Sequence, residues 1–159
     1  MKNKATSLII AAIAIYAAFI IYKLMKPFTY FSYAEFDSPD LPGSGEEFMN
    51  KEFIQKLDKI REDVGFPLKI NSGVRTKFWN QKVGGVKNSA HTKGLAADIA
   101  TPNGKGQKEI VAAALRQGIN RFGFGTNFIH LDVDTSKRPN VTWGYGNSVP
   151  SFSEIKNWV

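Results

Sequence analysis

The hydrophobic pattern separates an uninterrupted apolar run at the N-terminus from a longer region in which apolar and polar positions alternate. Residues 5–22, ATSLIIAAIAIYAAFIIY, carry no charged side chain and are bracketed by lysines. As a helix this run would span roughly 27 Å, close to the thickness of a bilayer core. It predicts one transmembrane helix within an N-terminal membrane anchor over 1–27. A cleaved signal peptide is the alternative, but the run is long for one and no small-x-small site follows it.

Beyond this run, helical and strand-like patterns follow one another. Phe53, Leu57, Ile60 and Val64 recur every three or four residues, which predicts an amphipathic helix over 46–64. Further predicted elements are strands at 68–75 and 96–101, a helix at 107–118, and a hairpin within 120–134. We therefore expect an α+β fold, with a small, mostly antiparallel sheet and helices packed on one side, preceded by one transmembrane helix.

Turn-forming residues set the expected domain boundaries. Residues 28–45 form a linker and lead-in segment, because 36–47, FDSPDLPGSGEE, is rich in proline, glycine, serine and aspartate. A single domain with its own hydrophobic core is expected over 46–148. Residues 149–159 form a C-terminal tail, and the sequence does not decide whether this tail packs on the domain.

Composition narrows the possible chemistry. The chain has no cysteine, so disulfides, thiolate catalysis and cysteine-rich zinc sites are excluded. The net charge is +7, but four of the 21 basic residues lie within the first 26 positions, where no acidic residue occurs. The remaining 17 basic residues face 14 acidic ones. We therefore expect no nucleic-acid partner, since a basic stripe or nucleic-acid motif is also missing from the sequence.

Both histidines of the chain stand near aspartates. His91 precedes Asp98 by seven residues, and His130 lies in the strand-like NFIHLDVD, where alternation places Asp132 and Asp134 on its face. Two histidines and one carboxylate are the ligands of a catalytic zinc site with an open position. On spacing alone, a loop histidine and a hydrogen-bonded strand histidine are the more economical interpretation.

Longer motifs change that balance. SAHTKGLAAD (89–98) fits the pattern S-x-H-x-x-G-x-A-x-D, and FSYAEFDSP, INSGVRT, VGGVKNSAH and FIHLDVD occur in matching order around it. Together they resemble the M15 family of zinc peptidases, the D-alanyl-D-alanine carboxypeptidases and L-alanyl-D-glutamate endopeptidases that cut peptidoglycan stem peptides. The resemblance covers roughly 31–146 and is nearest to the compact subgroup of phage and bacterial genomes.

The resemblance implies roles for particular residues. His91, Asp98 and His130 would be the ligands of Zn2+, and Arg75 would hold a substrate carbonyl or carboxylate. For Ser89, the resemblance implies a hydrogen bond to the substrate or to one of the zinc-ligating side chains. Two aromatic residues of VTWGYG, Trp143 and Tyr145, would form a wall of the cleft, although packing in the core explains them equally well.

The general base is the main departure from the family pattern. Many members carry Glu or Asp three residues before the last histidine, where this chain has Asn127. Asp132 is the nearest replacement and our candidate general base; orienting His130 is its alternative role. Asp134 is a more distant candidate.

The resemblance implies a membrane-anchored zinc-dependent peptidase that hydrolyses amide bonds in peptidoglycan stem peptides, for wall remodelling or endolysin-like lysis. We expect a single-pass membrane protein whose C-terminal domain faces the cell wall, in a bacterial inner membrane or the membrane of a bacterial virus. The alternative is a non-catalytic peptidoglycan-binding or structural module with a retained zinc site, which Asn127 would favour.

Overall fold

The computed structural model describes residues 4–25, 27–146 and 148–159. Its helices are α1 (Lys4–Met25), α2 (Ser44–Phe48), α3 (Lys51–Val64), α4 (Lys77–Lys82), α5 (Gln107–Arg116) and α6 (Phe152–Ile155). Its strands are β1 (Ile70–Ser72), β2 (Ala96–Ala100), β3 (Arg121–Phe124), β4 (Phe128–Asp132) and β5 (Val141–Gly144). The 3₁₀ turns are η1 (Tyr33–Phe36), η2 (Ala90–Lys93), η3 (Pro102–Gly104) and η4 (Lys156–Trp158).

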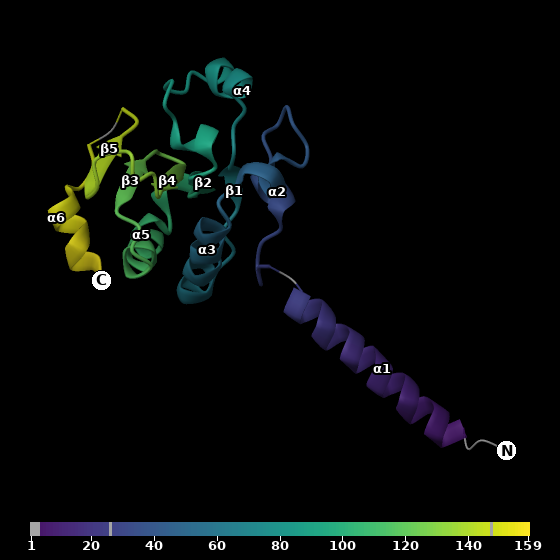
Figure 1. Cartoon of the computed structure of the whole chain (residues 1–159). Helices are drawn as coiled ribbons and strands as arrows, with labels where there is room; N and C mark the ends of the chain where they lie inside the picture. The colour runs from purple at the N-terminus through teal and green to yellow at the C-terminus, as the bar shows by residue number, and fades with distance from the viewer. Residues whose placement is uncertain (1–3, 26, 147) are drawn as a thin grey trace.

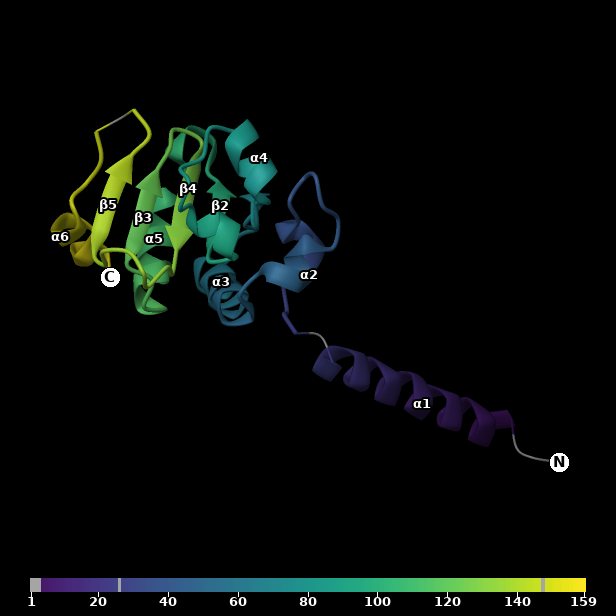
Figure 2. The ribbon, with the colours of Figure 1, turned by 45° about the horizontal axis from the view of Figure 1, so that its top comes forward.

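The strands form one sheet in the order β1-β2-β4-β3-β5. Every neighbouring pair is antiparallel except β3 and β5, which run parallel. The predicted α+β class and the mostly antiparallel sheet are therefore confirmed. Helices α3 and α5 lie together on one side of the sheet, whereas the short helix α4 lies on the other (Figure 1; Figure 2). The prediction that helices pack on one side thus holds for the two longer helices of the domain.

The core lies between the sheet and α3 and α5. Helix α3 buries Phe53, Ile54, Leu57 and Ile60 almost completely, at the spacing that predicted its amphipathic face. Each such side chain contributes roughly 1.5–3 kcal/mol by leaving water. The sheet presents residues from alternate strand positions to the same core: Ala97, Ile99, Phe122, Phe124, Ile129 and Leu131. The intervening positions of β2 and β4 are consequently directed to the opposite face, where polar residues stand.

The single helix predicted over 46–64 is interrupted. Residues Met49 and Asn50 separate α2 from α3, because the Asn50 side chain accepts a hydrogen bond from the Phe53 amide (2.8 Å) and caps α3. The Asn50 amide in turn donates to the Gly94 carbonyl (2.9 Å). The break therefore ties the helical layer to the turn that follows His91.

Other predicted elements are largely in place. The hairpin is confirmed, since β3 and β4 pair antiparallel around the turn that contains Gly125. The strand expected over 68–75 is shorter, because Val74 leaves the sheet to donate its amide hydrogen bond to Phe36. The tail packs back on the domain: Ile155 is fully buried, and the Trp158 ring meets Phe124 edge-on.

Helix α1 projects away from the rest of the chain (Figure 1). A search of the described residues finds no helix with the length and apolar character needed to cross a membrane. The transmembrane helix and membrane anchor predicted for 1–27 are therefore not supported. Residues 1–3 and 26 of that segment lie outside the described residues.

Candidate metal centre

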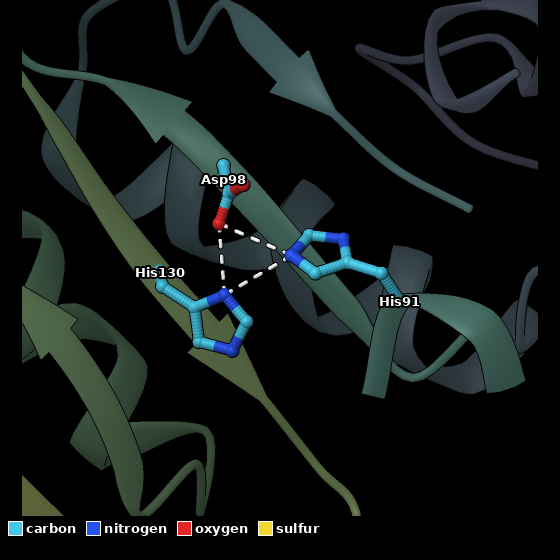
Figure 3. Close-up of side chains that lie close together, drawn as sticks. All are labelled: His91, Asp98 and His130. Carbon is cyan, nitrogen blue, oxygen red and sulfur yellow. Dashed lines mark hydrogen bonds and ion pairs between the residues drawn. The ribbon is translucent and has the colours of Figure 1, made fainter. Parts of the chain in front are cut away.

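Three side chains from three elements converge on the polar face of the sheet. His91 comes from η2, Asp98 from the middle of β2 and His130 from the middle of β4 (Figure 3). Asp98 and His130 are direct partners in the β2–β4 register. All three side chains are buried. The pairing of two central strands thus fixes two members of the cluster, and the turn before β2 supplies the third.

The distances within the cluster are those of a shared centre. His130 Nδ1 lies 2.8 Å from Asp98 Oδ1, and His91 Nε2 lies 3.2 Å from the same oxygen. The two imidazole nitrogens are 3.1 Å apart. One donor atom from each residue lies within 4.8 Å of the others. Two nitrogen lone pairs cannot face each other this closely without a proton or a cation between them.

The backbone holds His91 in one orientation. Its Nδ1 lies 2.6 Å from the Gly73 carbonyl oxygen, which can only accept, so Nδ1 carries the proton. Nε2 is then the bare nitrogen and is directed into the cluster. The turn itself begins at Ser89, whose hydroxyl accepts from the His91 amide (3.3 Å). It ends at Gly94, whose φ of 66° favours glycine and whose Cβ, if present, would lie 1.9 Å from the Phe48 carbonyl oxygen.

A carboxylate holds His130 in the corresponding way. His130 Nε2 lies 3.2 Å from Asp132 Oδ2, which accepts a hydrogen bond from it, and Nδ1 is the nitrogen that faces Asp98. The other Asp132 oxygen accepts from Arg121 Nε (2.7 Å) and from the Asp134 amide (3.0 Å). Asp132 is only 1% exposed, so both of its oxygens are committed inside the protein.

The donor set fits zinc. Two neutral imidazole nitrogens and one carboxylate oxygen are the protein ligands of catalytic zinc sites, in which a further position stays open for water or substrate. Hydrogen bonds to the outer nitrogen of each histidine, as made here by Gly73 and Asp132, are the usual means by which proteins orient such ligands. His91, Asp98 and His130 would therefore hold the ion.

The surroundings set the charge of these groups. Burial raises the pKa of the Asp98 carboxyl, but the contacts with His130 and His91 more than offset burial, so the net pKa is lowered. Burial lowers the pKa of His91, which favours the neutral form that a metal requires. For His130, burial is outweighed by Asp132 and Asp98, and the pKa is raised.

Arg75 is placed at the edge of the cluster. Its Nη2 lies 2.5 Å from Asp98 Oδ2, the oxygen not directed at the histidines, and its Nε donates to Ser72 Oγ (2.8 Å). The Arg75 amide donates to the His91 carbonyl (3.1 Å). The arginine therefore neutralises Asp98 and lies beside the position that a bound ion would take.

The predicted cleft aromatics occupy different positions. Trp143, on edge strand β5, has its ring centroid 5.3 Å from that of His130. Tyr145 lies beyond the strand, is 50% exposed, and packs against Phe128 with a centroid distance of 5.0 Å. Trp143 thus borders the cluster directly, and Tyr145 borders its outer side.

Asn127 lies away from the cluster. Its side-chain oxygen accepts from the Asn103 amide (3.0 Å), and its carbonyl accepts from the Thr101 amide (2.8 Å). These bonds join the β3–β4 turn to the loop after β2. Asn127 therefore stabilises the hairpin turn between β3 and β4 and does not contact the cluster.

Sequence reasoning did not identify two supporting ion pairs. Buried Arg121 binds Asp132, and its guanidinium lies 5.5 Å above the Trp143 ring. Lys93, two residues after His91, binds Asp134 (2.9 Å), four residues after His130. The one available signal was the arginine that opens the otherwise apolar strand RFGF.

This arrangement is compatible with the metal centre of a metallopeptidase. The family model of peptidase M15 matches residues 29–132, which include the whole cluster, Arg75, Ser89, Arg121 and Asp132. The chain therefore belongs to the peptidase M15 family. This membership supports, at a coarse level, a metallopeptidase that acts on peptidoglycan. A search of curated proteins finds no match to the chain.

Proposed function

We propose that this protein is a zinc-dependent peptidase that hydrolyses amide bonds in the stem peptides of peptidoglycan. One observation carries the proposal: three buried ligand atoms converge, and the Gly73 carbonyl and the Asp132 carboxylate each lie at the outer ring nitrogen of one histidine, so that the inner nitrogens face the centre. Family membership supplies the substrate class.

The residues of the candidate metal centre would have separate roles in the reaction. A zinc ion, when bound, would supply Lewis acidity toward the amide carbonyl and lower the pKa of water. His91 keeps its proton at Nδ1 on the Gly73 carbonyl, and His130 keeps its proton at Nε2 on Asp132. Asp98 presents one oxygen to the histidines and the other to Arg75. The Arg75 guanidinium is placed to stabilise negative charge on the substrate oxygen.

The contacts of Asp132 favour one of its two candidate roles. A general base must exchange a proton with water or substrate, whereas Asp132 is buried and binds His130, Arg121 and the Asp134 amide. We therefore propose that Asp132 orients His130 and fixes its tautomer. Its assignment as general base stays a prediction.

A binding module without turnover is the second candidate function. It is favoured by Asn127, which stands where many family members carry an acidic residue and is engaged with Asn103. Such a module would bind zinc and peptidoglycan but release no product.

Mass spectrometry of purified peptidoglycan separates these two functions. The zinc-loaded full chain is incubated with peptidoglycan beside a His91→Ala control, and soluble products are identified. The peptidase should release stem-peptide fragments that the control does not release, and their masses would name the bond that is cut. An unchanged profile from folded, zinc-loaded protein would favour the binding module.

A further inference from the structure

A cavity lies beside η2, the turn that carries His91, on the side of α4. It has a volume of about 590 Å³ and lies between α4 and η2. Its polar lining comes from both elements and from the loop between them: Lys77, Asn80, Gln81, Lys87, Asn88 and Thr92. We refer to it as the α4 cavity.

Chain connectivity places the α4 cavity beside the reacting groups. Lys77 stands two residues after Arg75, and Thr92 follows His91 directly. The intervening Thr76 fixes the start of α4, because its hydroxyl accepts from the Trp79 amide (3.0 Å). Figures 1 and 2 draw α4 on the side of the sheet opposite α3 and α5. A peptide lying across the metal centre would therefore reach this cavity within a few residues of the amide that is cut.

The lining of the α4 cavity includes two lysines and no acidic residue. The sequence from 64 to 97 contains six basic residues and no acidic one: Lys69, Arg75, Lys77, Lys82, Lys87 and Lys93. Lys77 and Lys87 line the cavity, and neither is in an ion pair among the described residues. A carboxylate placed between α4 and η2 would meet two ammonium groups and amide donors.

A buried polar atom at the wall of the cavity lacks a partner. Asn80 is 4% exposed, and its Nδ2 donates to the Val86 carbonyl (3.0 Å). Its Oδ1 has no hydrogen-bond partner within the part of the chain that the structure describes. Gly85, also in the lining, leaves room for this amide, because a Cβ there would stand 2.1 Å from Oδ1. The bond from Asn80 to Val86 therefore holds the loop that carries Lys87 against α4, which carries Lys77.

We propose that the α4 cavity binds a carboxylate-bearing part of the peptide substrate, with Lys77 and Lys87 as the carboxylate partners. The ligand class is an anionic stem peptide whose carboxylate lies a few residues from the cut amide. This inference rests on the proposed function and adds a preference for free over amidated side-chain carboxylates.

Two synthetic stem peptides test the proposal, one with its D-glutamate carboxylate free and one with that group amidated. Cleavage kinetics and calorimetric binding are measured for the zinc-loaded wild type and for Lys77→Gln/Lys87→Gln. Lys51→Gln/Lys59→Gln, which removes two lysines from α3, is the matched control. The wild type and the control should favour the free carboxylate about fivefold, the size expected of partly exposed ion pairs.

The cavity variant should lose this preference through a higher KM, with kcat within about twofold of the wild type, because the lysines bind ground and transition states alike. Equal cleavage and binding of both peptides by the wild type, or a preference that survives in the cavity variant, would overturn the proposal and leave the peptidase function standing. Binding that depends on the lysines without any cleavage would support the cavity and reject the peptidase function. Neither cleavage nor binding would reject both.

Discussion

His130 Nδ1 and Asp98 Oδ1 lie 2.8 Å apart because their residues are direct partners across β2 and β4. The alternation of each strand places Ile99, Ile129 and Leu131 in the core and these two polar side chains on the opposite face. A shift of the register by one residue would bury the polar pair in the core and expose the apolar set. The hydrophobic core thus holds these two candidate metal ligands in alignment.

Removing a ligand should abolish zinc binding and its effect on stability. A ligand that binds only the folded state stabilises it by about 2.7 kcal/mol when present at 100 times its Kd. We expect zinc to raise the Tm of the wild type, chelation to reverse the rise, and His91→Ala to show neither effect. Thermal unfolding followed by circular dichroism measures this, and an equal rise in His91→Ala would place the zinc elsewhere.

Asp132→Asn distinguishes orientation of His130 from general-base catalysis. Loss of a carboxylate that orients a ligand histidine typically weakens metal affinity about 10- to 100-fold. We expect that loss in Asp132→Asn, measured by competition with a chromophoric chelator. Unchanged zinc affinity together with a large fall in kcat would instead assign Asp132 as the base.

Arg121→Met should destabilise the fold. It leaves the Asp132 carboxylate, 1% exposed, without its cationic partner, and breaking a buried pair in this way costs about 3–5 kcal/mol. Arg116→Met is the matched control, since the Arg116–Asp63 pair is exposed and should contribute at most about 1 kcal/mol. Urea unfolding of the metal-free protein gives the free energy of unfolding of both variants. Equally small decreases in the two variants would show that the Arg121–Asp132 pair adds little stability.

The metal-free protein should lose stability in acid. The pKa values of Asp98 and Asp132 are lowered in the folded state, because the contacts of both carboxylates with the histidines, and the hydrogen bond from Arg121 to Asp132, outweigh burial. The unfolded chain therefore binds protons first as the pH falls. The contribution of both groups is present above the ordinary carboxyl pKa of about 4 and is lost below it.

The test is the free energy of unfolding of the chelated protein at a series of pH values. Asp98→Asn should show a shallower decline in acid than the wild type. A decline as steep as that of the wild type would mean that Asp98 is not a major source of the pH dependence.

The sequence was sufficient where local patterns decide the outcome. Alternation in NFIHLDVD correctly placed His130 and Asp132 on one face of β4, and the spacing of Phe53, Leu57 and Ile60 located α3. The M15 motifs pointed to three residues that the structure brings together in one cluster, and their role as zinc ligands stays a prediction.

Features that depend on distant partners could not be predicted in this way. The break at Asn50 results from a cap and from a bond to Gly94, which lies far along the chain. The parallel pairing of β5 with β3 and the contact of Arg121 with Asp132 likewise exist only after the sheet forms. The expected transmembrane helix rested on the length of an uncharged apolar run and on its flanking lysines, and the described helices do not support it.

Stem-peptide hydrolysis during zinc titration of the metal-free protein tests the central claim most directly. If His91, Asp98 and His130 form one catalytic metal centre, the rate should rise from near zero and reach a plateau at one equivalent of zinc. His130→Ala should stay inactive throughout. Hydrolysis that proceeds without zinc, or that is unchanged in His130→Ala, would contradict the account.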